Sequence, residues 1–165
     1  MANTGIKRKR KWWVILLLGF VLIPALVALR LRWFSNQGVI LTGSSAEGLF
    51  GQCSRDAPTG VSGLWCPYPW TIARLETNLP RFLRSNPNLR STFSLKHYYI
   101  QYTGFIKNGR YLIYANAFPD DLFGENPFMW RFRSQVVCDG GPAFFGFEFD
   151  PAMGQFSNLE FNGAI

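Results

Sequence analysis

LKHYYIQYTGFIKNGRYLIYANAF, residues 95–118, is the stretch that decides the fold of this chain. Two runs dense in Tyr, Ile and Phe, 95–107 and 110–118, flank the dipeptide Asn108-Gly109. Asn-Gly is the preferred centre of a two-residue type I′ turn, because both central residues of that turn need positive φ. The sequence therefore predicts a β-hairpin around these two residues.

A two-residue turn also fixes the register of the strands that it joins. The predicted pairs are Lys107 with Arg110, Ile106 with Tyr111, Gly104 with Ile113, Tyr102 with Ala115, and Gln101 with Asn116. Because side chains alternate along a strand, one face is apolar and is expected to join the core. Its members are Tyr98, Ile100, Tyr102, Ile106, Tyr111, Ile113, Ala115 and Ala117.

The opposite face of the hairpin mixes aromatic, amide and imidazole groups. Its members are His97, Tyr99, Gln101, Thr103, Phe105, Leu112, Tyr114, Asn116 and Phe118. If this face is open, it predicts a recognition site for a protein or a glycan. The contact residues would be Tyr99, Gln101, Tyr114, Asn116 and His97. The alternative is that a helix or the entry loop of the domain covers it.

The rest of this domain is predicted from periodicity and turn residues. Apolar residues at near-helical spacing predict a helix over 70–79, and Pro80 can open a second short turn, so we expect a broken helix. Three alternating runs, separated by turns rich in Asp, Gly and Pro, predict further strands at 130–138, 143–150 and 155–161. The expected fold is α+β, with the broken helix packed on an antiparallel β-meander of four to five strands.

A second decisive stretch is WWVILLLGFVLIPALVAL, residues 12–29, which contains no charged residue. As a helix it reaches about 27 Å, close to the hydrocarbon thickness of a bilayer. Tryptophans at 12, 13 and 33 mark the two interfaces, and we expect a transmembrane signal anchor over 12–33. A cleavable signal peptide is the rival interpretation.

Charge around the span predicts its orientation. Basic residues are denser before it, at 7–11, than after it, at Arg30 and Arg32. The positive-inside bias therefore makes residues 1–11 a cytoplasmic tail. We expect a single-pass protein of the bacterial inner membrane with its carboxyl-terminal part in the periplasm.

The formal net charge of +7 belongs to the region around the span. Residues 1–35 hold seven basic and no acidic residues, so the remaining ten basic residues balance the ten acidic ones. A neutral exported part lacks the electrostatic footprint of nucleic-acid binding, and nucleic acid is not expected as a partner. Composition divides this part into a Gly-, Ser- and Pro-rich linker and entry loop, 34–69, and an α+β domain, 70–165.

All three cysteines, Cys53, Cys66 and Cys138, lie in the part that is predicted to be exported. An oxidising compartment favours a disulfide there. Cys53 and Cys66 bracket a Gly- and Pro-rich loop whose closure contributes about 3 kcal/mol, so we expect these two to be bonded. Pairing of either one with Cys138 is the alternative.

Catalytic and metal-binding signals are weak. The chain has a single histidine, His97, and no Cys-x-x-Cys, so neither a metal nor a cofactor is expected. The first hypothesis is a non-enzymatic protein whose exported domain binds another envelope component. One alternative is a small periplasmic hydrolase or thiol enzyme that uses Cys138 with His97 as base. Another is an accessory subunit of a membrane complex.

The carboxyl-terminal third carries short motifs that resemble an uncharacterised family of small bacterial membrane-anchored proteins. The motifs are Cys138-Asp139-Gly140-Gly141, Asp150-Pro151 with Gly154, and Phe161-Asn162-Gly163. The resemblance implies membrane anchoring and brings no activity with it. The order of elements is also similar in general shape to cystatin-like and PepSY-like domains.

The predicted topology can be tested with reporter fusions. Alkaline phosphatase fused after Ile165 is expected to be active in a bacterial host, because the enzyme matures only outside the cytoplasm. An inactive fusion, together with an active cytoplasmic reporter at the same site, would reverse the orientation.

Overall fold

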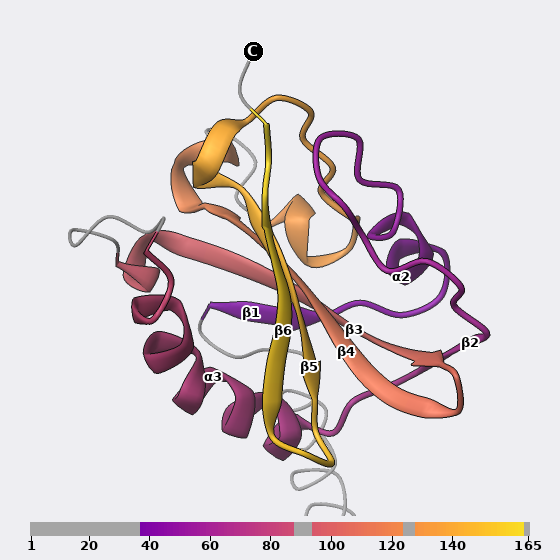
Figure 1. Cartoon of the computed structure of the whole chain (residues 1–165). Coiled ribbons are helices and arrows are strands. Elements are labelled where there is room, and N and C mark those ends of the chain that lie inside the picture. The colour runs from indigo at the N-terminus through magenta and orange to yellow at the C-terminus, as the bar shows by residue number, and fades with distance from the viewer. Residues whose placement is uncertain (1–36, 88–93, 124–127, 164–165) are drawn as a thin grey trace, which may run out of the picture. The chain divides into compact units, whose positions relative to one another are not determined.

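The predicted hairpin is the centre of the fold in a computed structural model of the 165-residue chain (Figure 1). Strands β3 (Tyr98–Lys107) and β4 (Arg110–Pro119) are joined by Asn108 and Gly109, whose φ angles are 52° and 72°. All five predicted cross-strand pairs are present. The turn chemistry and the register that the sequence predicts are therefore confirmed.

The structure describes residues 37–87, 94–123 and 128–163, all of which belong to one compact unit. The predicted span over 12–33 lies outside these residues. Within the described ranges, no helix has both the length and the apolar composition that crossing a bilayer requires.

The described strands form a six-stranded mixed sheet rather than an antiparallel meander. Its order is β1-β3-β4-β5-β6, with β2 also paired to β3. β1 (Gly38–Ile40) runs parallel to the first half of β3, and β2 (Gly63–Trp65) runs antiparallel to its second half. The other pairs are antiparallel. The α+β class is thus confirmed, and one parallel pair corrects the predicted topology.

The region predicted as a linker, 34–69, supplies part of the fold. Besides β1 and β2 it contains helix α2 (Ser44–Gly48). Val39, Ile40 and Leu41 are buried, and Leu49 is fully so. The linker prediction is corrected here, because a Gly- and Ser-rich composition describes the turns between these short elements and not their buried residues.

The last two strands match the sequence prediction closely. β5 (Phe145–Asp150) and β6 (Gln155–Phe161) are joined by a turn in which the Asp150 carboxylate accepts hydrogen bonds from the backbone N–H groups of Ala152 and Met153, at 2.8 and 3.0 Å. Gly154 closes the turn with a φ of 67°. Short carboxylates stabilise turns in this way.

Helix α3 (Pro69–Arg84) covers one face of the sheet (Figure 1). It is continuous through Pro80, so the predicted break is wrong. Pro80 removes one backbone hydrogen bond, but the buried side chains on either side of it keep a single helical spacing against the sheet. These side chains are Ile72, Leu75, Leu79 and Leu83.

The first core lies between α3 and the predicted apolar face of the hairpin. Phe145, Phe147 and Phe149 of β5 complete it and are fully buried. Most of the predicted core residues are in this cluster, but Tyr111 is 56% exposed because it lies beside the hairpin turn. Tyr102 donates a hydrogen bond to Glu76 of α3, 3.2 Å away, which joins helix and sheet.

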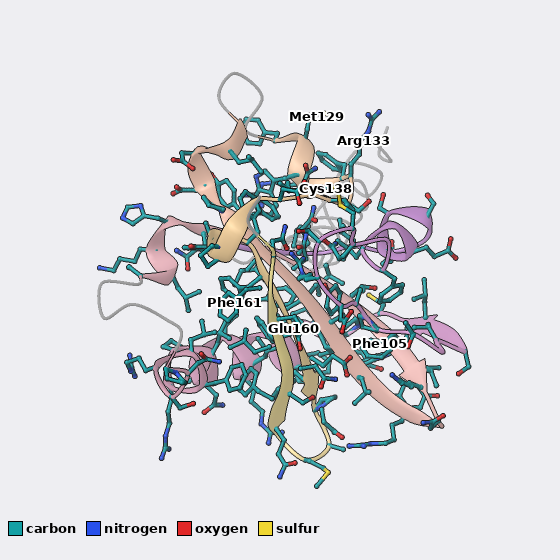
Figure 2. All side chains as sticks on the ribbon, turned by 45° about the horizontal axis from the view of Figure 1, so that its top comes forward. Phe105, Met129, Arg133, Cys138, Glu160 and Phe161 are labelled. Atoms are coloured by element: carbon teal, nitrogen blue, oxygen red, sulfur yellow. A yellow bond between two sulfur atoms is a disulfide. The ribbon has the colours of Figure 1, made fainter. Side chains whose placement is uncertain are left out.

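The opposite face of the hairpin is a second core and not an open surface. Residues 39–65 and 128–138 cover it, and Figure 2 shows Met129, Arg133 and Cys138 of the latter segment at the top of the view. Trp130 is fully buried there and stacks on Tyr99, with 4.2 Å between ring centroids. This burial matches the alternative that the entry loop covers the face, and recognition by the predicted set of residues stays a prediction.

The predicted strand over 130–138 does not form. Met129–Arg131 is a short 3-10 helix, and the backbone after it hydrogen bonds to side chains. Gln101 donates to the carbonyls of Trp130 and Arg133 at 2.5 and 2.6 Å, and it accepts from the N–H of Gln135 at 2.8 Å. Amide side chains thus take the place of a neighbouring strand. The other described 3-10 helices are Leu95–His97, Asp120–Phe123 and Gly141–Ala143.

The hairpin turn gives a stability prediction. Replacing Asn108→Ala together with Gly109→Val is expected to lower the free energy of unfolding by about 1 to 3 kcal/mol, since both side chains are forced to positive φ. The measurement is chemical denaturation of the full chain in detergent, followed by tryptophan fluorescence. Gly51→Ala is the control, because Gly51 is not among the positive-φ residues and the nearest atom to an added Cβ is 3.6 Å away. Equal stabilities for the double variant and the control would show that the turn does not depend on positive φ.

Candidate functional site

Arg55 organises a polar cluster on the second face of the sheet. Its guanidinium donates to the side-chain oxygens of Asn116 on β4 and of Asn162, which follows β6, and it lies 3.4 Å from the Tyr114 hydroxyl. Asn116 in turn donates to Gln101 at 3.2 Å and to the carbonyl of Gln135 at 2.8 Å. One cation therefore links three segments that are distant in the sequence.

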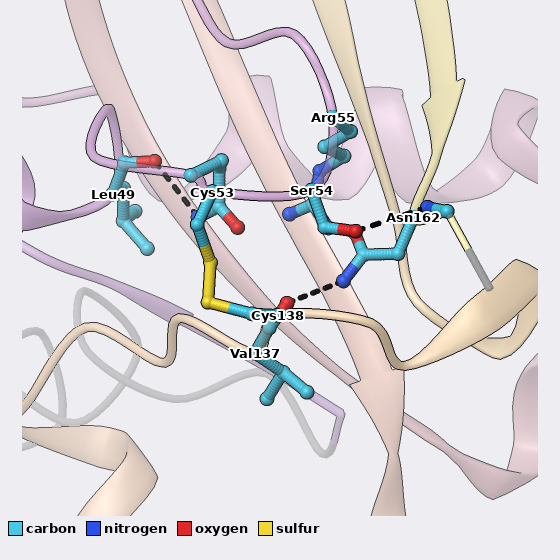
Figure 3. The surroundings of a disulfide bond; sticks show 9 residues. Leu49, Cys53, Ser54, Arg55, Val137, Cys138 and Asn162 are labelled. Atoms are coloured by element: carbon cyan, nitrogen blue, oxygen red, sulfur yellow. Dashed lines mark hydrogen bonds between the residues drawn. A yellow bond between two sulfur atoms is a disulfide. The ribbon is translucent and has the colours of Figure 1, made fainter. Parts of the chain in front are cut away.

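A disulfide lies beside this cluster and joins Cys53 to Cys138, with 5.4 Å between their Cα atoms (Figure 3). The predicted Cys53–Cys66 pair is wrong. Cys66 is free and packs against the first core, whereas Cys53 belongs to the segment that crosses the second face. The sheet separates these two thiols, while residues 53–55 and 137–138 lie side by side.

Hydrogen bonds hold the same segments together next to the disulfide. The N–H of Gly163 donates to the carbonyl of Ser54 at 2.9 Å, and the Asn162 amide donates to the carbonyl of Val137 (Figure 3). The chain entering the domain, the segment before β5 and the chain after β6 thus meet at one point. These contacts hold the segments around Arg55 in place, and they therefore also fix the position of Arg55.

Beyond Arg55, a polar pocket of about 360 Å³ opens between residues 56–59 and the sheet. Tyr114 of β4 and Glu148 of β5 are cross-strand partners at its floor. The remaining side chains that line it, apart from residues 56–59, are Lys107, Asn158 and Glu160. Glu160, which is exposed, belongs to β6 and is labelled in Figure 2.

Two backbone features lie beside this pocket. Gly146 carries no side chain, and a Cβ there would lie 2.6 Å from the Tyr114 hydroxyl and 2.9 Å from Nε of Arg55. β6 is irregular opposite β5, where the register shifts between Gly146 and Glu148. Asn158 lies in this bulge with a φ of 51°. Bulges commonly redirect side chains next to functional sites.

Glu148 is the unusual residue of the pocket. The residue as a whole is 7% exposed, its carboxylate oxygens are accessible from the pocket, and they make no hydrogen bond or ion pair with any residue in the described part of the chain. Burial raises the pKa of the neighbouring Tyr114 hydroxyl, the Arg55 guanidinium opposes that rise, and the Glu148 carboxylate adds to it. Tyr114 therefore remains protonated at neutral pH and offers an O–H to the pocket.

The five residues predicted as a recognition site lie in different environments. Gln101, Asn116 and Tyr114 are buried, Tyr99 is half-buried against Trp130, and His97 is exposed at the start of β3. Of these, Tyr114 alone lines the pocket. The predicted set does not form one exposed surface, because the segments that cover this face bury most of its members.

The residues that build the pocket were largely missed by sequence reasoning. Glu148 alternates with Phe145, Phe147 and Phe149, so the pattern places it on the opposite face, where an acidic residue is expected to be exposed and gives no signal of a buried site. Arg55 gives no such signal because it lies in a segment without helical or strand periodicity. Its partners, Asn116 and Asn162, are 61 and 107 residues away.

The two residues of the predicted thiol enzyme have other partners. The Cys138 sulfur is bonded to Cys53, so a thiolate at this position requires reduction of the disulfide. The His97 ring lies 3.8 Å from the Asp120 carboxylate, at an exposed site. Within the described ranges, no three acidic, histidine or cysteine residues are grouped closely enough to hold a metal ion.

Comparison of the chain with protein-family models, with curated proteins and with solved structures found no match in any of the three. The interpretation of the site therefore depends on its geometry.

The polar cluster gives a second stability prediction. Arg55→Met is expected to lower the free energy of unfolding by about 2 to 4 kcal/mol, because it leaves the buried oxygens of Asn116 and Asn162 without a donor. Glu148→Gln is expected to change it by less than about 1 kcal/mol, because this carboxylate has no partner to lose. Chemical denaturation of the full chain in detergent measures both.

Arg74→Met is the matched control for this experiment. Arg74 is exposed and donates a single hydrogen bond, to the carbonyl of Pro151 at 3.3 Å. We expect a loss below about 0.5 kcal/mol. If Arg55→Met costs no more than Arg74→Met, the cluster does not hold the three segments together.

Proposed function

We propose that this chain is a single-pass protein of the bacterial inner membrane whose periplasmic α+β domain binds another envelope component. The pocket at Glu148 is the binding site and receives a polar group of that component. The protein acts by recognition and not by catalysis.

The proposed location is supported by the sequence and by the cysteines. Residues 12–29 are long and apolar enough for a membrane span, and the basic residues before them favour a cytoplasmic amino terminus. The Cys53–Cys138 disulfide is typical of an oxidising compartment such as the periplasm.

Glu148 is the observation that carries the binding proposal. A carboxylate that the protein largely encloses without giving it a partner keeps its acceptor oxygens available to a ligand. Glu148 lies at the floor of an accessible pocket, so a ligand can reach it. A donor on the ligand would supply the hydrogen bonds that the described residues do not.

The composition of the pocket suits the binding of a polar group. Its described lining contains carboxylates, a lysine, a tyrosine hydroxyl and small polar groups. Pockets of this volume accommodate small ligands or a side chain of a larger partner. An envelope protein or a glycan can present such a group.

Site-specific photo-crosslinking tests the proposal. p-Benzoylphenylalanine in place of Thr59, an exposed residue of the pocket wall, is expected to give a discrete adduct in cells of the source organism. Thr77 is the matched control, because it is exposed on α3, which covers the other face of the sheet.

The adduct must also depend on the pocket. Adding Glu148→Gln is expected to remove it, whereas adding Glu47→Gln, at an exposed position on α2, leaves it unchanged. Adducts of equal intensity from positions 59 and 77, or an adduct that is indifferent to Glu148→Gln, would exclude the pocket as the binding site.

A further inference from the structure

We infer that the group entering the pocket is an organic cation with a primary ammonium, an inference that rests on the proposed function. Among the described residues that line the pocket, three carry carboxylates and one carries an ammonium. The carboxylates belong to Asp56, Glu148 and Glu160, and the ammonium to Lys107. At neutral pH this lining carries net negative charge, which attracts cations and repels anions.

Glu148 fixes where the cation binds. An ionised carboxylate is an acceptor only, so the ligand group that satisfies it must be a donor. A charged donor forms the stronger hydrogen bond with a carboxylate. The carboxylate oxygens are accessible from the pocket, so a ligand group can reach them directly.

Arg55 does not fill this role. Its guanidinium is engaged by the oxygens of Asn116 and Asn162 and lies near the Tyr114 hydroxyl, behind the floor of the pocket. It forms no ion pair within 4.0 Å of Glu148 in the described structure. No cation of the described residues lies within ion-pair distance of Glu148, so this carboxylate is free to pair with a cationic ligand.

The spacing of the acidic groups argues for an organic cation and against a metal ion. A divalent metal needs several oxygen ligands at 2.0 to 2.6 Å around one point. No group of three such residues in the described part of the chain meets that requirement, although three carboxylates line this pocket. An ammonium needs one close carboxylate and tolerates the others at a distance.

A matched series of five-carbon probes tests the charge that the pocket selects. The probes are 5-aminopentan-1-ol, pentane-1,5-diol and glutarate, with calcium chloride as the metal probe. Isothermal titration of the full chain in detergent micelles is expected to show saturable binding of the amino alcohol. The neutral diol is expected to bind at least tenfold more weakly, and glutarate and calcium are expected to show no binding at this site.

Two variants test which residue of the pocket recognises the charge of the ligand. Glu148→Gln keeps the size of the side chain, removes its charge, and is expected to weaken binding of the amino alcohol at least tenfold. Lys107→Met removes the opposing ammonium at the pocket and is expected to tighten binding severalfold. Glu47→Gln, which removes a negative charge on α2, is expected to leave affinity unchanged.

The outcomes separate this inference from the proposed function. Tighter binding of the diol, of glutarate or of calcium, or no binding of the amino alcohol, overturns the cation assignment. Unchanged affinity in Glu148→Gln overturns it too. In each case a crosslink from position 59 that still depends on Glu148 leaves the pocket as the binding site for a ligand of another class.

Discussion

The buried hydrogen bonds of Gln101 and Asn116 are the constraint on which the second layer of this protein depends. Both amides lie on the hairpin, and between them they bind the backbone of residues 130–135 and the guanidinium of Arg55. Buried amides must be satisfied, and irregular chain can do this where a regular strand cannot. The segments that cover this face are therefore held by specific polar contacts in addition to apolar burial.

The two faces of the sheet consequently differ in kind. Helix α3 and the phenylalanines of β5 make an apolar layer, whereas the other face combines Trp130, Phe105 and Phe118 with the amide and guanidinium groups. The Cys53–Cys138 bond closes a sequence separation of 85 residues over that mixed face. In the chain-entropy model such a closure contributes about 4 kcal/mol. The disulfide and the polar contacts thus hold the second layer against the sheet, whereas the packing of α3 holds the first layer.

The pocket lies where this second layer ends. The covering segments bury most of this face of β3 and β4, and the pocket lies between residues 56–59 and residues of β4, β5 and β6. Gly146 leaves the space that the Tyr114 hydroxyl and Arg55 occupy, and Asn158 of the bulge lines the pocket. The same segment supplies both Arg55, which anchors it, and residues 56–59, which form the wall. One residue of this segment therefore stabilises the fold, and its neighbours control access to the pocket. Because the two roles belong to different residues, Glu148 can be mutated without disturbing the fold.

The sequence by itself determined the hairpin, its register, the two carboxyl-terminal strands and their turns, because these depend on contacts between neighbours in the chain and on the φ preferences of Asn and Gly. It also determined the neutral charge of the part after residue 35. Tertiary structure alone decided which thiol pairs with Cys53, whether residues 130–138 form a strand, and whether the helix continues through Pro80. It also decided that residues 56–59 and Glu148 line the same pocket. These outcomes depend on segments up to 107 residues apart, whose proximity no local pattern encodes.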